Sequence, residues 1–135
     1  MKKRVSIFIL FISILGGLVM VFSLNGERQE SAEEKRNREY EVSLVKALKN
    51  SYRDIEEIKL SSPDYSDPPG DWNCTVQLTF SDGQVIEYFL GHSLYLKVNK
   101  SAITNDVNSE ILSSHYGETK NKIKVIFSNG EEALE

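Results

Sequence analysis

Few residues of this chain could catalyse a reaction or hold a metal ion. There are two histidines, His92 and His115, and a single cysteine, Cys74. Neither histidine belongs to a cluster of ligands with the spacing of a metal site. Ser93 follows His92, but neighbouring side chains on a strand point to opposite faces, and no Gly-x-Ser-x-Gly elbow occurs. The sequence therefore predicts no catalytic residue, no metal and no cofactor.

Three aspartates, Asp64, Asp67 and Asp71, lie close together near the middle of the chain. Their order does not match an EF-hand calcium loop, which also needs a glutamate at its end. We interpret them as solvated carboxylates of a loop. All three prolines fall in the same stretch, from Ser61 to Gly70. Because proline fixes φ and lacks a donor, this stretch is expected to be an ordered loop outside the sheet.

This loop is the best candidate for an interaction surface. Long ordered loops in small domains are usually functional, and proline rigidity lowers the entropy cost of association. Its acidity favours a partner with a basic face. The candidate partner-binding residues lie in the loop from Ser62 to Asp71, at its exit and in the adjoining Gly91-His92 turn: Tyr65, Asp67, Asp71, Trp72 and His92.

The residues from Trp72 to Phe80 show the clearest strand pattern. Apolar and polar side chains alternate throughout, as in a strand with one buried and one exposed face. Cys74 lies on the apolar side and is expected to be a buried free thiol. A turn at Asp82-Gly83 should return the chain into a partner strand from Val85 to Leu90.

The outer face of this partner strand also carries apolar side chains. Val85 and Phe89 flank Glu87 there. This arrangement indicates partial cover on that face as well.

Further helices and strands should surround this hairpin. An amphipathic pattern predicts a helix from Tyr40 to Arg53, and a second helix is expected from about Ala102 to Ser114, capped by Thr104 or Asn105. We expect an α+β domain with one antiparallel sheet of four or five strands, packed on one face by one or two helices. Alternation and turn signals predict the remaining strands at Ile58–Leu60, Leu94–Val98 and Ile123–Phe127, with a short edge strand at Glu131–Glu135 after the Asn129-Gly130 turn.

The first 24 residues predict a membrane anchor. No ionisable side chain occurs from Val5 to Leu24, and a helix of this length crosses about 30 Å of hydrocarbon. The preceding Lys2, Lys3 and Arg4 should stay in the cytoplasm, which places the chain after Leu24 outside. The run is longer than the core of a cleaved signal peptide and lacks an Ala-x-Ala site. Secretion after signal cleavage is the alternative.

A charged segment follows the anchor. Ten of the fifteen residues from Glu27 to Glu41 are charged, and no apolar stripe runs through them. We interpret this segment as a solvated helical stalk that continues into the helix at Tyr40. The expected division is a cytoplasmic tip and signal-anchor at 1–24, a stalk at 25–39 and an extracytoplasmic α+β domain at 40–135.

The exported part is acidic. The chain has 16 Lys and Arg and 20 Asp and Glu; without the three cations ahead of the anchor, 13 face 20, so residues 25–135 carry −7. Such a domain has no electrostatic reason to bind nucleic acid. One cysteine cannot close an internal disulfide, so packing must stabilise the fold, which suits a Gram-positive bacterial surface.

The layout resembles small membrane-anchored proteins of unknown function from Gram-positive bacteria. The shared features are a Lys-rich start, one apolar span, a charged helix, and Lys-Ala-Leu-Lys-Asn-Ser-Tyr leading into Ile55-Glu56-Glu57-Ile58. With its Asp71–Tyr88 hairpin, the chain is also similar to the TipC-type immunity proteins of streptococci. The resemblance implies an outward-facing, membrane-anchored domain that neutralises a secreted toxin. The chain is shorter than those proteins, and no functional residue carries over.

The expected function is therefore non-enzymatic. The main hypothesis is a membrane-anchored extracytoplasmic domain that binds a protein partner. The expected partner is a protein with a basic surface or a secreted toxin. Immunity against such a toxin is the first alternative. A cell-envelope enzyme is the second, and it is disfavoured because no acid–base pair is visible in the sequence.

Overall fold

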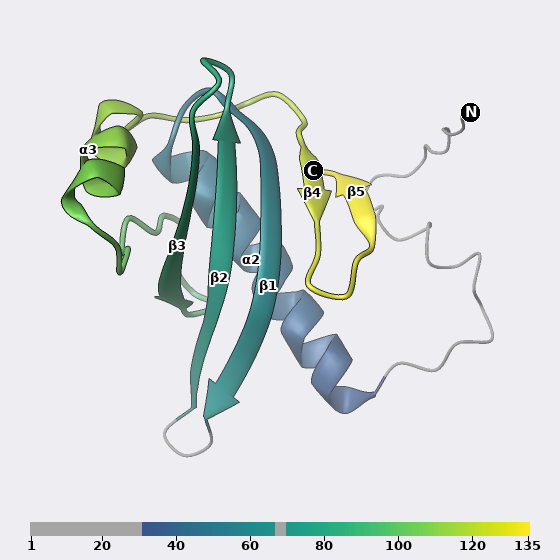
Figure 1. Cartoon of the computed structure of the whole chain (residues 1–135). Helices are drawn as coiled ribbons and strands as arrows, with labels where there is room; N and C mark the ends of the chain where they lie inside the picture. Colours follow the sequence, from purple (N-terminus) through teal and green to yellow (C-terminus); the bar gives the residue numbers. More distant parts are fainter. Residues whose placement is uncertain (1–30, 67–69) are drawn as a thin grey trace.

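The computed structural model describes residues 31–66 and 70–135, which form an α+β fold (Figure 1). The predicted anchor Val5–Leu24 and the first part of the predicted stalk lie outside these residues. Within the described ranges, no helix is long and apolar enough to cross a membrane. The elements in chain order are α2 (Ala32–Ser51), β1 (Ile55–Ser66), β2 (Asp71–Phe80), β3 (Val85–His92), α3 (Asp106–Ser114), β4 (Lys124–Ile126) and β5 (Glu132–Leu134).

The five strands form one mixed sheet in the order β3-β2-β1-β4-β5. Neighbouring strands are antiparallel except β1 and β4, which are parallel. The prediction of a purely antiparallel sheet is therefore wrong at this pair. Parallel neighbours need a long crossover, and the chain between β3 and β4, which includes α3, supplies it. Alternation within a strand carries no information about such a distant partner.

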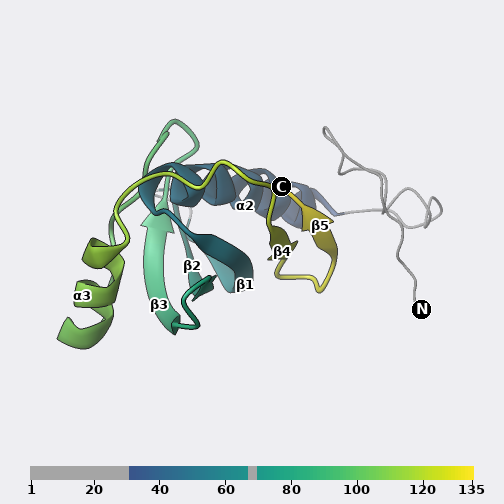
Figure 2. The same ribbon diagram turned by 90° about the horizontal axis from the view of Figure 1, so that it is seen from above.

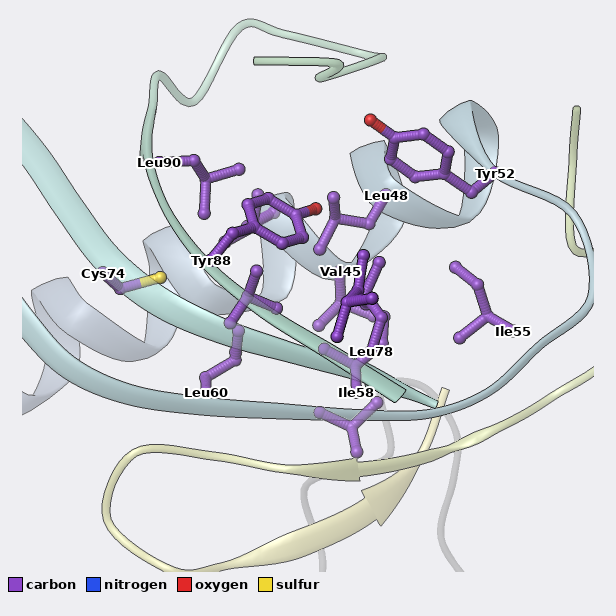
Figure 3. Packing of buried hydrophobic residues seen from close by; sticks show 14 of the residues in the cluster. Val45, Leu48, Tyr52, Ile55, Ile58, Leu60, Cys74, Leu78, Tyr88 and Leu90 are labelled. Atoms are coloured by element: carbon purple, nitrogen blue, oxygen red, sulfur yellow. The ribbon is translucent and has the colours of Figure 1, made fainter. Parts of the chain in front are cut away.

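Helix α2 packs across one face of the sheet, and α3 lies beside β3 at its edge (Figure 2). A capping box begins α2: the Ser31 side chain accepts from the backbone N–H of Glu34, whose carboxylate accepts from the backbone N–H of Ser31. The inner residues of α2 meet those of the strands in one apolar core (Figure 3). The core side chains that α2 contributes are Leu44, Val45, Ala47 and Leu48.

The hairpin of β2 and β3 confirms the strongest pattern in the sequence. Buried and accessible residues alternate along β2 from Trp72 to Phe80. The turn at Asp82-Gly83 is also confirmed, and Gly83 has a φ of +91°, which glycine adopts without strain. The expected C-terminal strand and edge strand are present as β4 and β5.

The predicted loop from Ser61 to Gly70 is wrong over most of its length. Strand β1 continues to Ser66, and its register with β2 shifts between Ser61 and Asp64. This irregularity contains Ser62, whose φ is +51°, and Pro63. Proline is tolerated in a sheet at such a bulge or at an edge, where no ladder donor is required. The proline therefore marks a bulged strand and does not end it.

Two further expectations need correction. The residues from Leu94 to Val98 form no strand; the segment contacts α2 instead, where Asn50 donates to the Lys97 carbonyl. Its alternation spans too few residues to distinguish a strand from an irregular loop. Helix α3 begins at Asp106, later than Ala102, but the predicted cap Asn105 is confirmed: it is the N-cap, and its side chain accepts from the Asn108 N–H.

The structure confirms Cys74 as a buried free thiol on the inner sheet face. Burial raises its pKa to about 12, so the thiol stays un-ionised near neutral pH. We expect Cys74→Ser to lower the free energy of unfolding by about 1–3 kcal/mol, because the hydroxyl would be buried without a good partner. Urea denaturation measures this cost, with Thr75→Ser on the accessible face as the control. Rapid labelling of the native thiol would contradict the burial.

Candidate functional site

Three of the five predicted site residues form one row across the sheet. Tyr65 of β1 pairs with Trp72 of β2, and Trp72 pairs with His92 of β3. All three side chains face α2: Tyr65 and Trp72 lie against its N-terminal half, and His92 lies against Ser43 near its middle. The structure therefore brings these residues together, although their separation in sequence is large.

Trp72 lies beneath α2 and is 1% exposed. Its ring stacks on Tyr40 with centroids 5.2 Å apart, and its Nε1–H donates to the Asn37 side-chain oxygen at 3.0 Å. The indole is therefore a core side chain with a satisfied polar atom. In this conformation it cannot contact a partner.

The other predicted residues differ in accessibility. Tyr65 is half-buried, and the Arg36 guanidinium lies 4.4 Å from the centre of its ring. Asp71 is exposed and pairs with Ser66 at the end of the hairpin. Asp67 lies outside the described residues. Of the five predicted residues, Tyr65 and Asp71 are thus the described ones that a partner could reach.

His92 takes part in a constellation that sequence reasoning missed. Its Nε2 lies 2.9 Å from the Ser43 hydroxyl of α2, and its Nδ1 lies 3.0 Å from the Asn99 side-chain nitrogen. A groove of about 430 Å³ borders Ser43 and is also lined by Val42 and Leu94. A serine, a histidine and an amide in this order have the layout of a nucleophile, a base and its orienting group.

The orientation of Asn99 decides what this constellation can do. Its oxygen accepts from the backbone N–H of Ser101 at 3.1 Å, and its nitrogen donates to the Gly91 carbonyl at 2.9 Å. Backbone groups cannot exchange these roles, so the amide nitrogen must also donate to Nδ1 of His92. Nδ1 is then an acceptor.

In the neutral imidazole, Nε2 therefore carries the proton and donates it to Ser43. Ser43 in turn donates to the Leu94 carbonyl at 3.3 Å. A general base needs a free Nε2 lone pair to take the serine proton, and this tautomer has none. The chain of hydrogen bonds fixes the end of β3 and the loop after it to α2, and does not activate Ser43.

The other histidine, His115, ends α3 as its C-cap. Its Nδ1 lies 2.7 Å from the Ile111 carbonyl, and its Nε2 lies 3.0 Å from a carboxylate oxygen of Asp82. Its ring stacks on Phe80 at 3.9 Å. The Gln84 backbone N–H and, to a lesser extent, His115 lower the pKa of Asp82. These contacts connect the β2–β3 turn to α3. In the described part of the chain, no three His, Cys, Asp or Glu residues are grouped for a metal.

Burial lowers the pKa of His92 to about 4. The unfolded chain therefore binds a proton at His92 below about pH 6.5 while the folded chain does not. The contribution of neutral His92 to the free energy of unfolding is complete above pH 6.5. It falls by about 3 kcal/mol in total as the pH decreases to 4. Burial raises the pKa of Glu41 and Glu135. Their protonation therefore increases the free energy of unfolding as the pH decreases, opposite to the effect of His92.

The measurement is the urea denaturation free energy between pH 4 and pH 7.5, compared with that of His92→Gln. The difference isolates His92 because both proteins retain Glu41 and Glu135. We expect the free energy of unfolding of wild type to fall relative to that of the variant as the pH decreases below 6.5. Parallel curves would show that His92 is not held neutral by the fold.

One side of the sheet carries an apolar surface that the sequence analysis did not select. Phe89 forms an antiparallel bridge with Ile103, so their side chains point to the same outer face as Val85. Val107 follows in the first turn of α3, next to Asn108, which donates to the Glu87 carbonyl. The exposed fractions are 54% for Val85, 40% for Phe89, 68% for Ile103 and 65% for Val107. We call these four residues the lateral patch.

The expected partial cover at Val85 and Phe89 is therefore limited to the Ile103 segment at the edge of β3. The flanking of Glu87 by two apolar residues was the sequence signal for this surface. Its extension to Ile103 and Val107 depends on a contact between distant segments.

Comparison of this chain with protein-family models, curated proteins and solved structures finds no match.

Proposed function

We propose that this protein is a non-enzymatic domain, anchored by Val5–Leu24 and located outside the cytoplasm, that binds a protein partner. The lateral patch is the observation that supports binding. Its four large apolar side chains are 40–68% exposed on adjoining segments. Contiguous exposed apolar side chains on a small domain are typical of an interaction site.

The geometry around His92 supports the non-enzymatic part of the proposal. The hydrogen bonds of Asn99 place the imidazole in the tautomer that donates to Ser43. The buried ring also has a pKa of about 4, which makes it a weak base. The constellation is better suited to holding β3 against α2 than to activating a nucleophile.

A membrane-impermeant, amine-reactive cross-linker applied to intact cells tests location and binding together. The full-length protein should form a discrete cross-linked product. Phe89→Thr with Ile103→Thr keeps strand propensity but removes the apolar contacts. We expect this double variant to lose about tenfold or more of the product, equivalent to about 1.4 kcal/mol of hot-spot contribution.

The matched comparison changes the hairpin surface predicted from the sequence. Tyr65→Ala, Asp67→Ala and Asp71→Ala together should leave the product intact if the partner docks on the lateral patch. Loss of the cross-linked product in the triple variant alone would place the partner at the hairpin end. The three side chains would then contribute about 1 kcal/mol or more to the binding free energy. The absence of any product in cells whose control surface proteins do cross-link would contradict the proposed function. A secreted toxin as the cross-linked partner would favour the immunity alternative.

A further inference from the structure

The segments that carry the lateral patch are acidic. Residues 81–96 and 101–119, which include β3 and α3, contain no lysine and no arginine. They contain five carboxylates of a domain whose net charge is −7: Asp82, Glu87, Asp106, Glu110 and Glu118. The same segments contain all four apolar residues of the patch. Acidic and apolar residues therefore occur together in these segments.

Three of these carboxylates border the patch directly. Glu87 lies between Val85 and Phe89 on the same face of β3, because alternate residues of a strand share a face. Asp106 precedes Val107 in sequence, and Glu110 lies one turn further along the same helix. Asp82 is not part of this border, since its carboxylate bonds to His115.

Glu87, Asp106 and Glu110 have no ion pair among the described side chains. Asp106 and Glu110 are also four residues apart on one helix, where like charges repel. The side chains of nearby lysines do not lie at these carboxylates. The Lys100 ammonium lies 4.3 Å from the Tyr116 ring centre, and Lys59 is two strands from Glu87, across Gln77. Among the described residues, the border of the patch is thus negative charge without a cationic side-chain partner, although Asp106 lies in the first turn of α3, where the helix dipole favours a carboxylate.

We propose that the lateral patch docks a protein surface with an apolar centre and a border of lysine and arginine. The apolar centre would bury Phe89 and Ile103, and the cations would pair with Glu87, Asp106 and Glu110. Complementary charge raises the rate of encounter and sets orientation, while apolar burial supplies affinity. This inference rests on the proposed function and specifies the chemistry of its partner.

The probe is a short, water-soluble peptide of lysines and leucines that carries a benzophenone group, mixed with the full-length protein in zwitterionic nanodiscs. Ultraviolet cross-linking followed by mass spectrometry gives both the yield and the position of the adducts. Empty nanodiscs measure peptide lost to lipid, and a glutamate-for-lysine version of the peptide is the charge control. We expect adducts within residues 85–110 and a yield that falls with rising salt.

Two charge-reversal pairs separate local recognition from net charge. Glu87→Lys with Glu110→Lys changes the border of the patch, whereas Glu39→Lys with Glu56→Lys makes the same change in net charge at exposed positions elsewhere. We expect the first pair to lower the adduct yield about tenfold or more and the second pair to lower it by about twofold or less. Phe89→Thr with Ile103→Thr should lower it as well.

Equal losses in the two charge-reversal pairs, or adducts distributed outside residues 85–110, would overturn the inference. The cross-linking experiment on intact cells remains an independent test of the proposed function. If its product still depends on Phe89 and Ile103 while the peptide result is negative, the domain binds a protein of different chemistry. If no product forms in cells, the proposed function itself fails.

Discussion

Trp72→Ala should lower the free energy of unfolding by about 3–5 kcal/mol, the cost typical of removing a large buried aromatic side chain. The ring is 1% exposed, stacks on Tyr40 and donates to Asn37 across the interface between β2 and α2. Its removal would leave a cavity at that interface. Such a loss is a large part of the 5–15 kcal/mol that stabilises an ordinary domain.

Circular dichroism during urea denaturation measures this effect, because Trp72 is the only tryptophan and its fluorescence disappears with it. Trp72→Phe is the matched variant, which keeps most of the ring and removes the hydrogen bond to Asn37. We expect it to cost about 1–2 kcal/mol. A cost below about 1 kcal/mol for Trp72→Ala, combined with the loss of the cross-linked partner, would identify Trp72 as a binding residue and contradict its core role.

A chain that begins at Tyr40 should be less stable than one that begins at Ser31 by about 3 kcal/mol. The shorter chain loses the capping box, the Arg36 contact with Tyr65 and the Asn37 hydrogen bond to Trp72. It also loses Arg38, which pairs with Glu131 and covers the Phe127 ring. Each contact contributes about 0.5–1 kcal/mol.

Thermal unfolding of the two chains measures the difference. The control is Glu33→Ala with Lys35→Ala in the longer chain, because both side chains are exposed and the ion pair of Glu33 with Arg36 is long, at 3.9 Å. We expect this control to change stability by less than about 0.5 kcal/mol. Equal stability of the two truncated chains would show that residues 32–39 only space the domain from the membrane, as the sequence suggested.

These two experiments concern the residues for which sequence reasoning was least informative. Local patterns correctly predicted β2, its turn into β3, the buried thiol of Cys74 and the C-terminal hairpin. In each case the signal lies within a few residues, because side-chain alternation and turn residues are local properties. The N-terminal half of α2 has no apolar stripe. Besides Tyr40, its contacts with Trp72 and Tyr65 come from the side chains of Arg36 and Asn37, which follow no apolar period. Periodicity therefore could not predict that this half of the helix packs on the sheet.

In the candidate site, too, local features could be predicted from the sequence and contacts between distant segments could not. The sequence correctly selected aromatic residues that lie together, but their burial depends on contacts with a helix that lies earlier in the chain. The hydrogen bonds of His92 join Ser43, His92 and Asn99 from three separate segments. The lateral patch similarly needs Ile103 to pair with Phe89. Contacts between distant segments of this kind follow from tertiary packing, and short-range periodicity does not contain them.

The bulge at Ser62-Pro63 has a consequence for neighbouring copies of the protein. Strand β4 pairs only with Glu57–Lys59 of β1, so it does not cover the edge of β1 beyond that point. An uncovered edge is a template onto which another chain can add its own strand. Pro63 offers no N–H, and the bulge interrupts the ladder there. The same irregularity that hides the strand from sequence analysis therefore also hinders the addition of a strand from a second copy of the protein.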